Sequence, residues 1–176
     1  MKVPAIYNFP PFFTRQVNEN TWQSQKSAWQ KWIHIWCREH RITQLTIHSG
    51  LLECPLIYNE SIHRTLPLPV FREIVEDMVK QNDAEWTQKK EPRDTFWVYW
   101  RSIAEWGDII TKWLFDTGRD GAVCTYYELQ EQCKEVDCLE EGLLHKVLES
   151  LMKKGNVELM KGSSGKYTGF KVLSTS

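Results

Sequence analysis

Few residues in this 176-residue chain have the spacing that a catalytic or phosphate-binding site requires. The stretch Gly162–Lys166, GSSGK, looks like the end of a phosphate-binding loop, but Tyr167 stands where such a loop carries Ser or Thr. The residues that follow are typical of a strand rather than of the helix such a loop needs. We therefore expect a solvated turn here.

The thiols, imidazoles and carboxylates do not form a site either. Cys133 and Cys138, with His145 seven residues further on, lack the paired spacing of a zinc site. The acidic pairs Glu76-Asp77 and Glu140-Glu141 are adjacent on predicted helices, so their carboxylates point apart. The remaining histidines are scattered: His34, His40, His48 and His63. We predict no enzymatic activity, no catalytic residue, no metal and no cofactor.

Composition is that of an ordinary folded protein, with 41% hydrophobic and 26% charged residues. The length suits one large domain or two small ones, and no apolar run is long enough to span a bilayer. Five cysteines, an odd number without a CxxC pair, favour reduced thiols in the cytosol. The net charge of −1 leaves no basic footprint for a nucleic acid or an acidic membrane.

The first 18 residues carry an unusual cluster of aromatics and prolines, YNFPPFF over residues 7–13. The prolines in this segment exclude a signal peptide, a regular helix and an inner strand. They also favour extended geometry for the residue before each of them. We expect an extended arm, uncharged between Lys2 and Arg15. Two interpretations stay open: the phenylalanines cover the chain's own core, or the arm is a preformed docking ligand for another protein.

After this arm, the same order of predicted helices and strands occurs twice along the chain. The first pass predicts a helix at 19–40, a strand at 44–48, a short helix at 59–64, a helix at 66–81, and strands at 84–88 and 95–100. The second predicts a helix at 103–117, a strand at 122–125, helices at 126–132 and 139–154, and strands at 156–161 and 168–173. A shift of 73 residues places Phe71 on Leu144 and Met78 on Leu151.

A second shift, of 77 residues, pairs Trp29 with Trp106 and Trp36 with Trp113, and we expect all four in the cores. The repeated order is that of a winged helix. We predict an α+β fold, mainly helical, with two tandem winged-helix domains at 19–101 and 102–176 behind the arm of residues 1–18. A DNA-binding transcription regulator is the alternative function, although the helices at 66–81 and 139–154 mix acidic with basic residues.

Four stretches together carry a family resemblance: FPPFFTRQ (9–16), ECPLIYNE (53–60), EWGDIITKW (105–113) and TYYELQE (125–131). In this combination the chain resembles the family of the small winged-helix subunit of the ESCRT-II complex, essentially from end to end. The one departure is the short segment QCKEVDC (132–138), where the family has a longer acidic loop.

The resemblance implies a non-catalytic adaptor for ubiquitin-dependent cargo sorting into multivesicular bodies. The arm would dock on the two larger winged-helix subunits through Phe9, Pro10, Pro11, Phe12 and Phe13, with two copies of the chain in each complex. The second domain would recruit an ESCRT-III subunit. By the same resemblance the protein is cytoplasmic, binds no nucleic acid directly, and reaches the endosomal membrane only through its partners.

Overall fold

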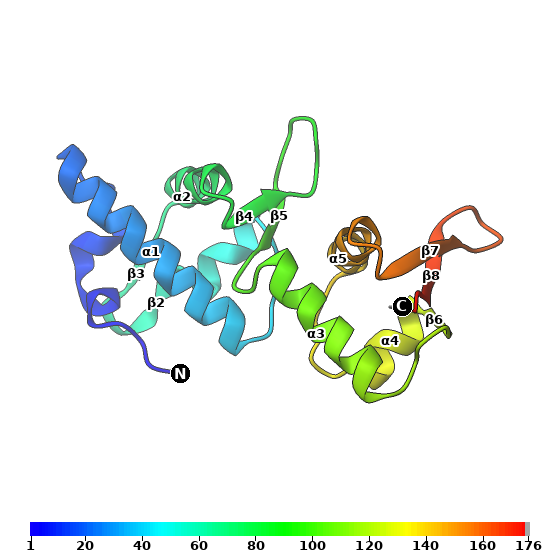
Figure 1. Cartoon of the computed structure of the whole chain (residues 1–176). Helices are drawn as coiled ribbons and strands as arrows, with labels where there is room; N and C mark the ends of the chain where they lie inside the picture. The colour runs from blue at the N-terminus through cyan, green and yellow to red at the C-terminus, as the bar shows by residue number, and fades with distance from the viewer. Residues whose placement is uncertain (175–176) are drawn as a thin grey trace. The chain divides into compact units, whose positions relative to one another are not determined.

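The computed structural model describes residues 1–174 (Figure 1). The chain divides into two compact units, the first from Met1 to Trp100 and the second from Arg101 onward. The first unit includes the whole of the predicted arm. Each unit has its own three-stranded sheet.

The first unit is built on a long helix with a tryptophan face. Its elements are η1 (Ala5–Asn8), η2 (Pro10–Phe13), α1 (Glu19–Glu39), β1 (Gln44–Thr46), η3 (Ser49–Glu53), β2 (Tyr58–Asn59), η4 (Glu60–Ile62), β3 (Arg64–Thr65), α2 (Leu68–Lys80), β4 (Ala84–Trp86) and β5 (Thr95–Val98). The side chain of Asn18 caps α1 by accepting a hydrogen bond from the backbone of Thr21 at 3.0 Å. The seven-residue spacing of Trp22, Trp29 and Trp36 then places all three indoles on the buried face of the helix.

The second unit repeats this plan with shorter connections. Its elements are α3 (Ile103–Asp116), β6 (Val123–Thr125), α4 (Tyr126–Gln132), α5 (Glu141–Lys153), β7 (Val157–Lys161) and β8 (Tyr167–Val172). Ser102 and Glu105 form a reciprocal capping box at the start of α3. The apolar face of α5 is fully buried: Leu143, Leu144, Val147, Leu148 and Leu151.

The two three-stranded antiparallel sheets have the same strand order, β1-β5-β4 in the first unit and β6-β8-β7 in the second. Equivalent side chains fill equivalent places in them. Phe96 on the middle strand β5 lies between Leu45 and Trp86, and Phe170 on β8 lies between Cys124 and Leu159. Both phenylalanines are buried. The predicted duplication and the winged-helix order therefore hold in three dimensions.

Three sequence-based expectations need correction. The arm is not extended: Ala5–Asn8 and Pro10–Phe13 form two 3₁₀ turns, which tolerate prolines because the first positions of a turn need no backbone donor. The short helix predicted at 59–64 is a two-strand ladder around a 3₁₀ turn, and the short helical element lies earlier, at Ser49–Glu53. Trp113 is only partly buried, and the guanidinium of Arg119 lies 4.6 Å from the centre of its ring.

Candidate functional site

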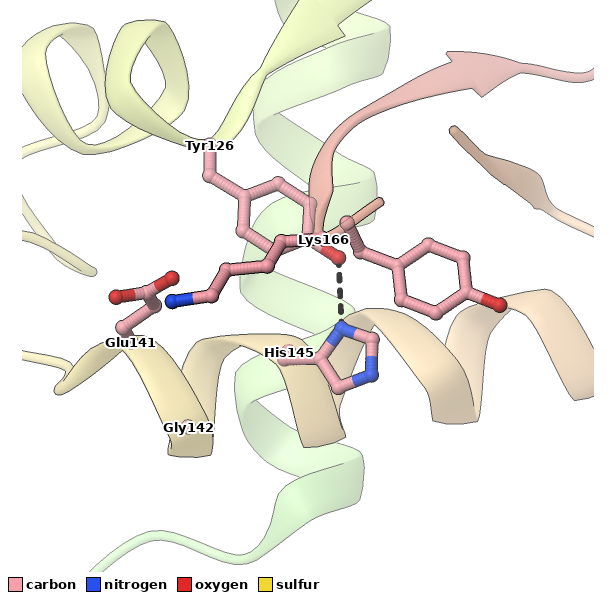
Figure 2. A pocket seen from close by; sticks show the side chains of 6 residues that line it. Tyr126, Glu141, Gly142, His145 and Lys166 are labelled. Carbon is pink, nitrogen blue, oxygen red and sulfur yellow. Dashed lines mark hydrogen bonds between the residues drawn. The ribbon is translucent and has the colours of Figure 1, made fainter. Parts of the chain in front are cut away.

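Several polar and aromatic residues of the second unit line one shallow pocket, drawn in Figure 2. The pocket measures about 360 Å³ and is lined by Tyr126, Glu141, Gly142, His145, Lys166 and Tyr167. The Tyr126 hydroxyl and the Nδ1 atom of His145 are hydrogen-bonded at 2.8 Å, and the imidazole stacks on the ring of Tyr167 at 5.1 Å. His145 is therefore held by the Tyr126 phenol and by stacking on Tyr167, with the Glu149 carboxylate 3.8 Å from its Nε2 atom, and none of the residues that line the pocket is a Ser, Thr or Cys.

The protonation state of Tyr126 also indicates a structural rather than a catalytic role for this pocket. Burial, reinforced by the nearby carboxylate of Glu149, raises the pKa of Tyr126 to about 12, so the phenol stays neutral at physiological pH. Among the described residues, no three His, Cys, Asp or Glu side chains are placed to hold a metal ion. Within the same part of the chain, no helix is long and apolar enough to cross a membrane.

The arm (residues 1–18) is the most unusual local structure of the first unit. Successive turns are closed by backbone hydrogen bonds from Tyr7 to Pro4 and from Phe9 to Ile6, both at 3.0 Å. A further bond runs from the N–H of Phe12 to the carbonyl of Phe9 at 2.9 Å. Phe9, the residue before Pro10, keeps the extended geometry expected of that position. The turns fold the arm back on its own unit.

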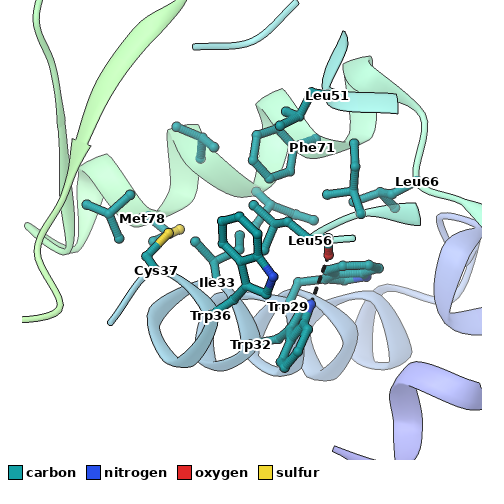
Figure 3. Packing of buried hydrophobic residues seen from close by; sticks show 14 of the residues in the cluster. Trp29, Trp32, Ile33, Trp36, Cys37, Leu51, Leu56, Leu66, Phe71 and Met78 are labelled. Carbon is teal, nitrogen blue, oxygen red and sulfur yellow. Dashed lines mark hydrogen bonds between the residues drawn. The ribbon is translucent and has the colours of Figure 1, made fainter. Parts of the chain in front are cut away.

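Three aromatic side chains of the arm point into the core of the first unit. Phe12 is stacked on Trp29 with ring centroids 4.2 Å apart and planes 4° from parallel. Phe13 meets the same indole edge-on at 5.2 Å, and Tyr7 meets Phe13 edge-on at 5.5 Å. Figure 3 shows Trp29 and its neighbour Trp32 on α1, with the indole N–H of Trp32 bonded to the carbonyl of Leu56 at 2.8 Å.

Buried hydrogen bonds hold the arm's backbone in register with α1. The Gln25 side-chain amide donates to the carbonyls of Phe12 at 2.8 Å and Thr14 at 2.7 Å. Its oxygen accepts from the backbone N–H of Gln16 at 3.2 Å. The indole N–H of Trp29 donates to the Phe12 carbonyl at 3.0 Å. These bonds give the carbonyls of Phe12 and Thr14 hydrogen-bond partners where the arm packs on α1.

The other end of the arm is tied to the segment 53–60. The Tyr7 hydroxyl donates to the carbonyl of Tyr58 at 2.8 Å and also contacts that of Pro55. The side-chain amide of Asn59 donates to the Tyr7 carbonyl at 2.7 Å. Burial, with a contribution from the neighbouring thiol of Cys54, raises the pKa of Tyr7 to about 12. The phenol is therefore a permanent hydrogen-bond donor at neutral pH.

A charged clasp closes the arm at Arg15. Its guanidinium donates to both carboxylate oxygens of Glu73 on α2, at 3.0 and 2.9 Å, and lies 4.7 Å from the centre of the Trp22 ring. This pairing lowers the pKa of Glu73. Because both side chains are well exposed to solvent, the clasp contributes orientation more than stability.

The five residues predicted to dock divide into two groups. Phe9, with 57% of its surface exposed, and the neighbouring Pro10 and Pro11 lie on the outside of the turn. Phe12 and Phe13 are buried in the chain's own core. The first interpretation of the arm, that phenylalanines cover the chain's own core, therefore holds for Phe12 and Phe13, and docking through the exposed residues stays a prediction.

Sequence reasoning missed the polar residues that position this turn, above all Gln25 and Asn59. One signal was present for the first of them, because Gln25 is a polar residue three positions from Trp22 on the apolar face of α1. Asn59 gave no comparable signal. Its role depends on a contact with Tyr7 across 52 positions of the chain.

Comparisons with known proteins agree over nearly the whole chain. The family model described as ESCRT-II complex subunit matches residues 6–140. The chain is 74% identical over 173 residues to vacuolar protein-sorting-associated protein 25 of Schizosaccharomyces pombe, covering 98% of this chain and 99% of that protein. It is 32% identical over 171 residues to the protein of the same name from Homo sapiens, covering 95% and 96%.

Solved structures give the same result. The crystal structure of subunit VPS25 of the endosomal trafficking complex ESCRT-II superposes with a TM-score of 0.85 at 27% identity, covering 97% of this chain and 98% of that one. The VPS22/VPS25/VPS36 crystal structure of ESCRT-II contains a chain that superposes with a TM-score of 0.82 at 25% identity, covering 96% and 98%. The DNA-binding alternative finds no support in these matches.

The division of the arm predicts unequal stability effects for two phenylalanines three residues apart. Phe12→Ala removes a ring stacked on Trp29 and is expected to lower the free energy of unfolding by about 3–5 kcal/mol. Phe9→Ala changes a solvent-exposed ring and is expected to change it by less than about 0.5 kcal/mol. Urea unfolding followed by circular dichroism measures both. Equal effects of the two variants would contradict the packing described here.

The raised pKa of Tyr7 predicts a contribution to alkaline unfolding. Between its ordinary value of 10.0 and about 12, the unfolded chain releases the Tyr7 proton before the folded chain does. The free energy of unfolding should therefore fall as the pH rises through this range. Tyr7→Phe removes this contribution, and its free energy of unfolding should fall less steeply than that of the wild type. If the free energies of unfolding of wild type and variant, each taken relative to its own value at pH 7, fall equally with pH, the Tyr7 phenol does not contribute to alkaline unfolding.

Proposed function

The chain belongs to the ESCRT-II complex subunit family, and from this we propose how its parts serve the complex. As a member of this family it is a structural subunit of an endosomal trafficking and vacuolar sorting machinery and not an enzyme. Its relatives assemble with VPS22 and VPS36 in the solved ESCRT-II structure. We infer that those two larger subunits are its partners, and that each complex contains two copies of this chain.

The arm is the docking element of the proposed assembly. Phe9, Pro10 and Pro11 are the exposed part of the PPFF sequence and offer apolar surface to a pocket on a larger subunit. Phe12 and Phe13 contribute indirectly. Their burial against Trp29 fixes the turn that exposes Phe9 and the two prolines. The observation that carries this proposal is the exposure of Phe9 beside two prolines in a segment otherwise tied to the core.

Rigidity is what makes the arm suitable for docking. Its turns are closed by backbone bonds and fixed at both ends, by Tyr7 with Asn59 and by Arg15 with Glu73. A ligand that is already ordered loses little conformational entropy on binding, so more of the contact energy appears as affinity. Exposed aromatic rings entering pockets are frequent hot spots of binding energy.

The second unit is proposed to recruit an ESCRT-III subunit, and so to link cargo sorting to budding into multivesicular bodies. It has a complete core of its own, drawn from α3, α5 and the β6-β8-β7 sheet. The protein would work on the cytoplasmic side of the endosome for ubiquitin-dependent sorting, held at the membrane by its partners. The mixed charge of α5, with Glu141, Lys146 and Glu149, suits a protein partner better than a phosphate backbone.

Docking through the exposed part of the arm is tested by native mass spectrometry after co-expression with the two larger subunits. The triple variant Phe9→Ala, Pro10→Ala and Pro11→Ala is expected to fold but to lose assembly, while the wild type gives a mass with two copies of this chain. Val17→Ala, which changes an exposed apolar residue of the same arm, is the matched control and should assemble normally. A triple variant that assembles as the wild type does would refute docking through these residues.

Recruitment by the second unit is tested with a chain ending at Trp100. The core of the first unit consists entirely of residues between Tyr7 and Val98, so this shortened chain is expected to fold and to assemble with the larger subunits. It should no longer retain the ESCRT-III subunit in a pull-down with the assembled complex. Retention equal to that of the full chain would place the ESCRT-III contact outside residues 101–176.

A further inference from the structure

A pocket of about 260 Å³ lies in the first unit between α2 and the loop that joins β4 to β5 (Figure 1). This loop, residues 87–94, is the wing of the first unit. Cationic, apolar and acidic side chains line the pocket: Arg72, Glu76, Val79, Lys80, Trp86, Glu91 and Arg93. None of them belongs to the arm or to the second unit.

The pocket uses a face of α2 that the core and the arm do not occupy. A spacing of four residues places Arg72, Glu76 and Lys80 on one side of the helix. Glu73 and Asp77, each one position further along, are instead paired with Arg15 of the arm and with Lys26 of α1. The charged side chains of the pocket therefore take no part in holding the arm.

Two arginines are held in position at the pocket by contacts within the first unit. The guanidinium of Arg72 lies 5.6 Å from the centre of the Trp86 ring and donates to the backbone carbonyl of Arg93. The guanidinium of Arg93 donates to the carbonyl of Lys89 at 2.9 Å. Both cationic groups are thus ordered before any ligand binds, which lowers the entropy cost of binding.

The positive charge of Arg93 is poorly compensated. Its partner Glu91 places Oε1 3.9 Å from the Nε atom, which is beyond hydrogen-bond distance. The other oxygen of Glu91 accepts from the backbone N–H of Arg93 at 3.1 Å. Within residues 1–174 the buried Nε atom has no hydrogen-bond partner. A buried polar group without a partner is unfavourable, and an anion beside the guanidinium would offset part of this cost.

The local charge differs in sign from that of the whole chain. Around the pocket and along the wing, five cations face three carboxylates, an excess of two positive charges in a chain of net charge −1: Arg72, Lys80, Lys89, Lys90 and Arg93 against Glu76, Glu91 and Asp94. Asp94 is already engaged, since its carboxylate accepts from the side-chain amide of Gln88 at 2.8 Å. The excess favours an anionic ligand.

The size of the charge excess and the shape of the site narrow the ligand. Two positive charges are too few to neutralise the many phosphates that a nucleic acid presents. The site is also a pocket with apolar walls at Val79 and Trp86, which a flat membrane surface cannot fill. A short peptide with carboxylates beside an apolar side chain matches both properties.

We propose that this pocket binds an acidic segment of a partner protein. Carboxylates of the segment pair with the guanidinium groups of Arg72 and Arg93, which suit the planar carboxylate geometry. A neighbouring apolar side chain packs against Val79 and Trp86. Lys89 and Lys90, both exposed on the wing, attract further acidic residues of the same segment.

Fluorescence anisotropy of the full chain with a labelled peptide, made of glutamates around one central leucine, tests this site. The wild type is expected to bind this peptide, with an affinity that falls as salt is added. The double variant Arg72→Gln and Arg93→Gln should bind it about tenfold more weakly or worse. Lys31→Gln with Arg64→Gln removes two positive charges from exposed residues outside the pocket, and should stay within about twofold of the wild type.

A second variant keeps the test decisive if the arginine variant does not fold, which thermal unfolding detects. Lys89→Gln with Lys90→Gln changes only exposed side chains of the wing, and it should also weaken peptide binding. Unchanged affinity in the folded variants would overturn the proposal, as would equal binding of a peptide with glutamines in place of glutamates. Tighter binding of duplex DNA or of phosphatidylserine vesicles than of the peptide, lost in the same variants, would assign the pocket to phosphates and overturn it too.

Discussion

The packing around Trp29 is the interaction on which the first unit depends most. Its indole is covered by Phe12 on one face and by Phe13 at the edge, and its N–H satisfies the carbonyl of Phe12. The Trp29 side chain on α1 thus gives the arm a buried apolar contact, two aromatic ring contacts and a hydrogen bond. This contact helps to decide which residues of the arm face solvent, together with the hydrogen bonds from Gln25 and Asn59.

The duplicated unit shows that this arrangement is a property of one copy and not of the fold. Trp106 occupies in α3 the place that Trp29 occupies in α1, but the group over its ring is the guanidinium of Arg101, at 5.1 Å. The second unit therefore completes its core without a preceding aromatic segment. Since the shared fold does not require the arm, the exposed apolar residues of the arm are better explained by a partner than by folding.

Much of the architecture could be predicted from the sequence because it follows from periodicity. The tryptophan spacing gave α1, the apolar stripes gave α2 and α5, and the internal shift gave the duplication. The arm was predicted less well. Local rules state what Pro10 and Pro11 forbid, but the choice between an extended chain and a 3₁₀ turn depends on acceptors and rings far along the chain, such as Gln25 and Trp29. Such tertiary contacts have no local pattern.

The 3₁₀ turn explains how a single tetrapeptide both fills the core and places apolar surface in solvent. In an extended strand successive side chains alternate between two faces, so each face of PPFF would carry one proline and one phenylalanine. The observed turn instead sorts the residues by type, with Pro10 and Pro11 exposed and Phe12 and Phe13 buried. The phenylalanines stabilise the turn through the core, and the prolines limit the backbone of the part that remains in solvent. The exposed apolar surface of the arm is therefore ordered in the free chain, because its order is supplied by the unit that carries it.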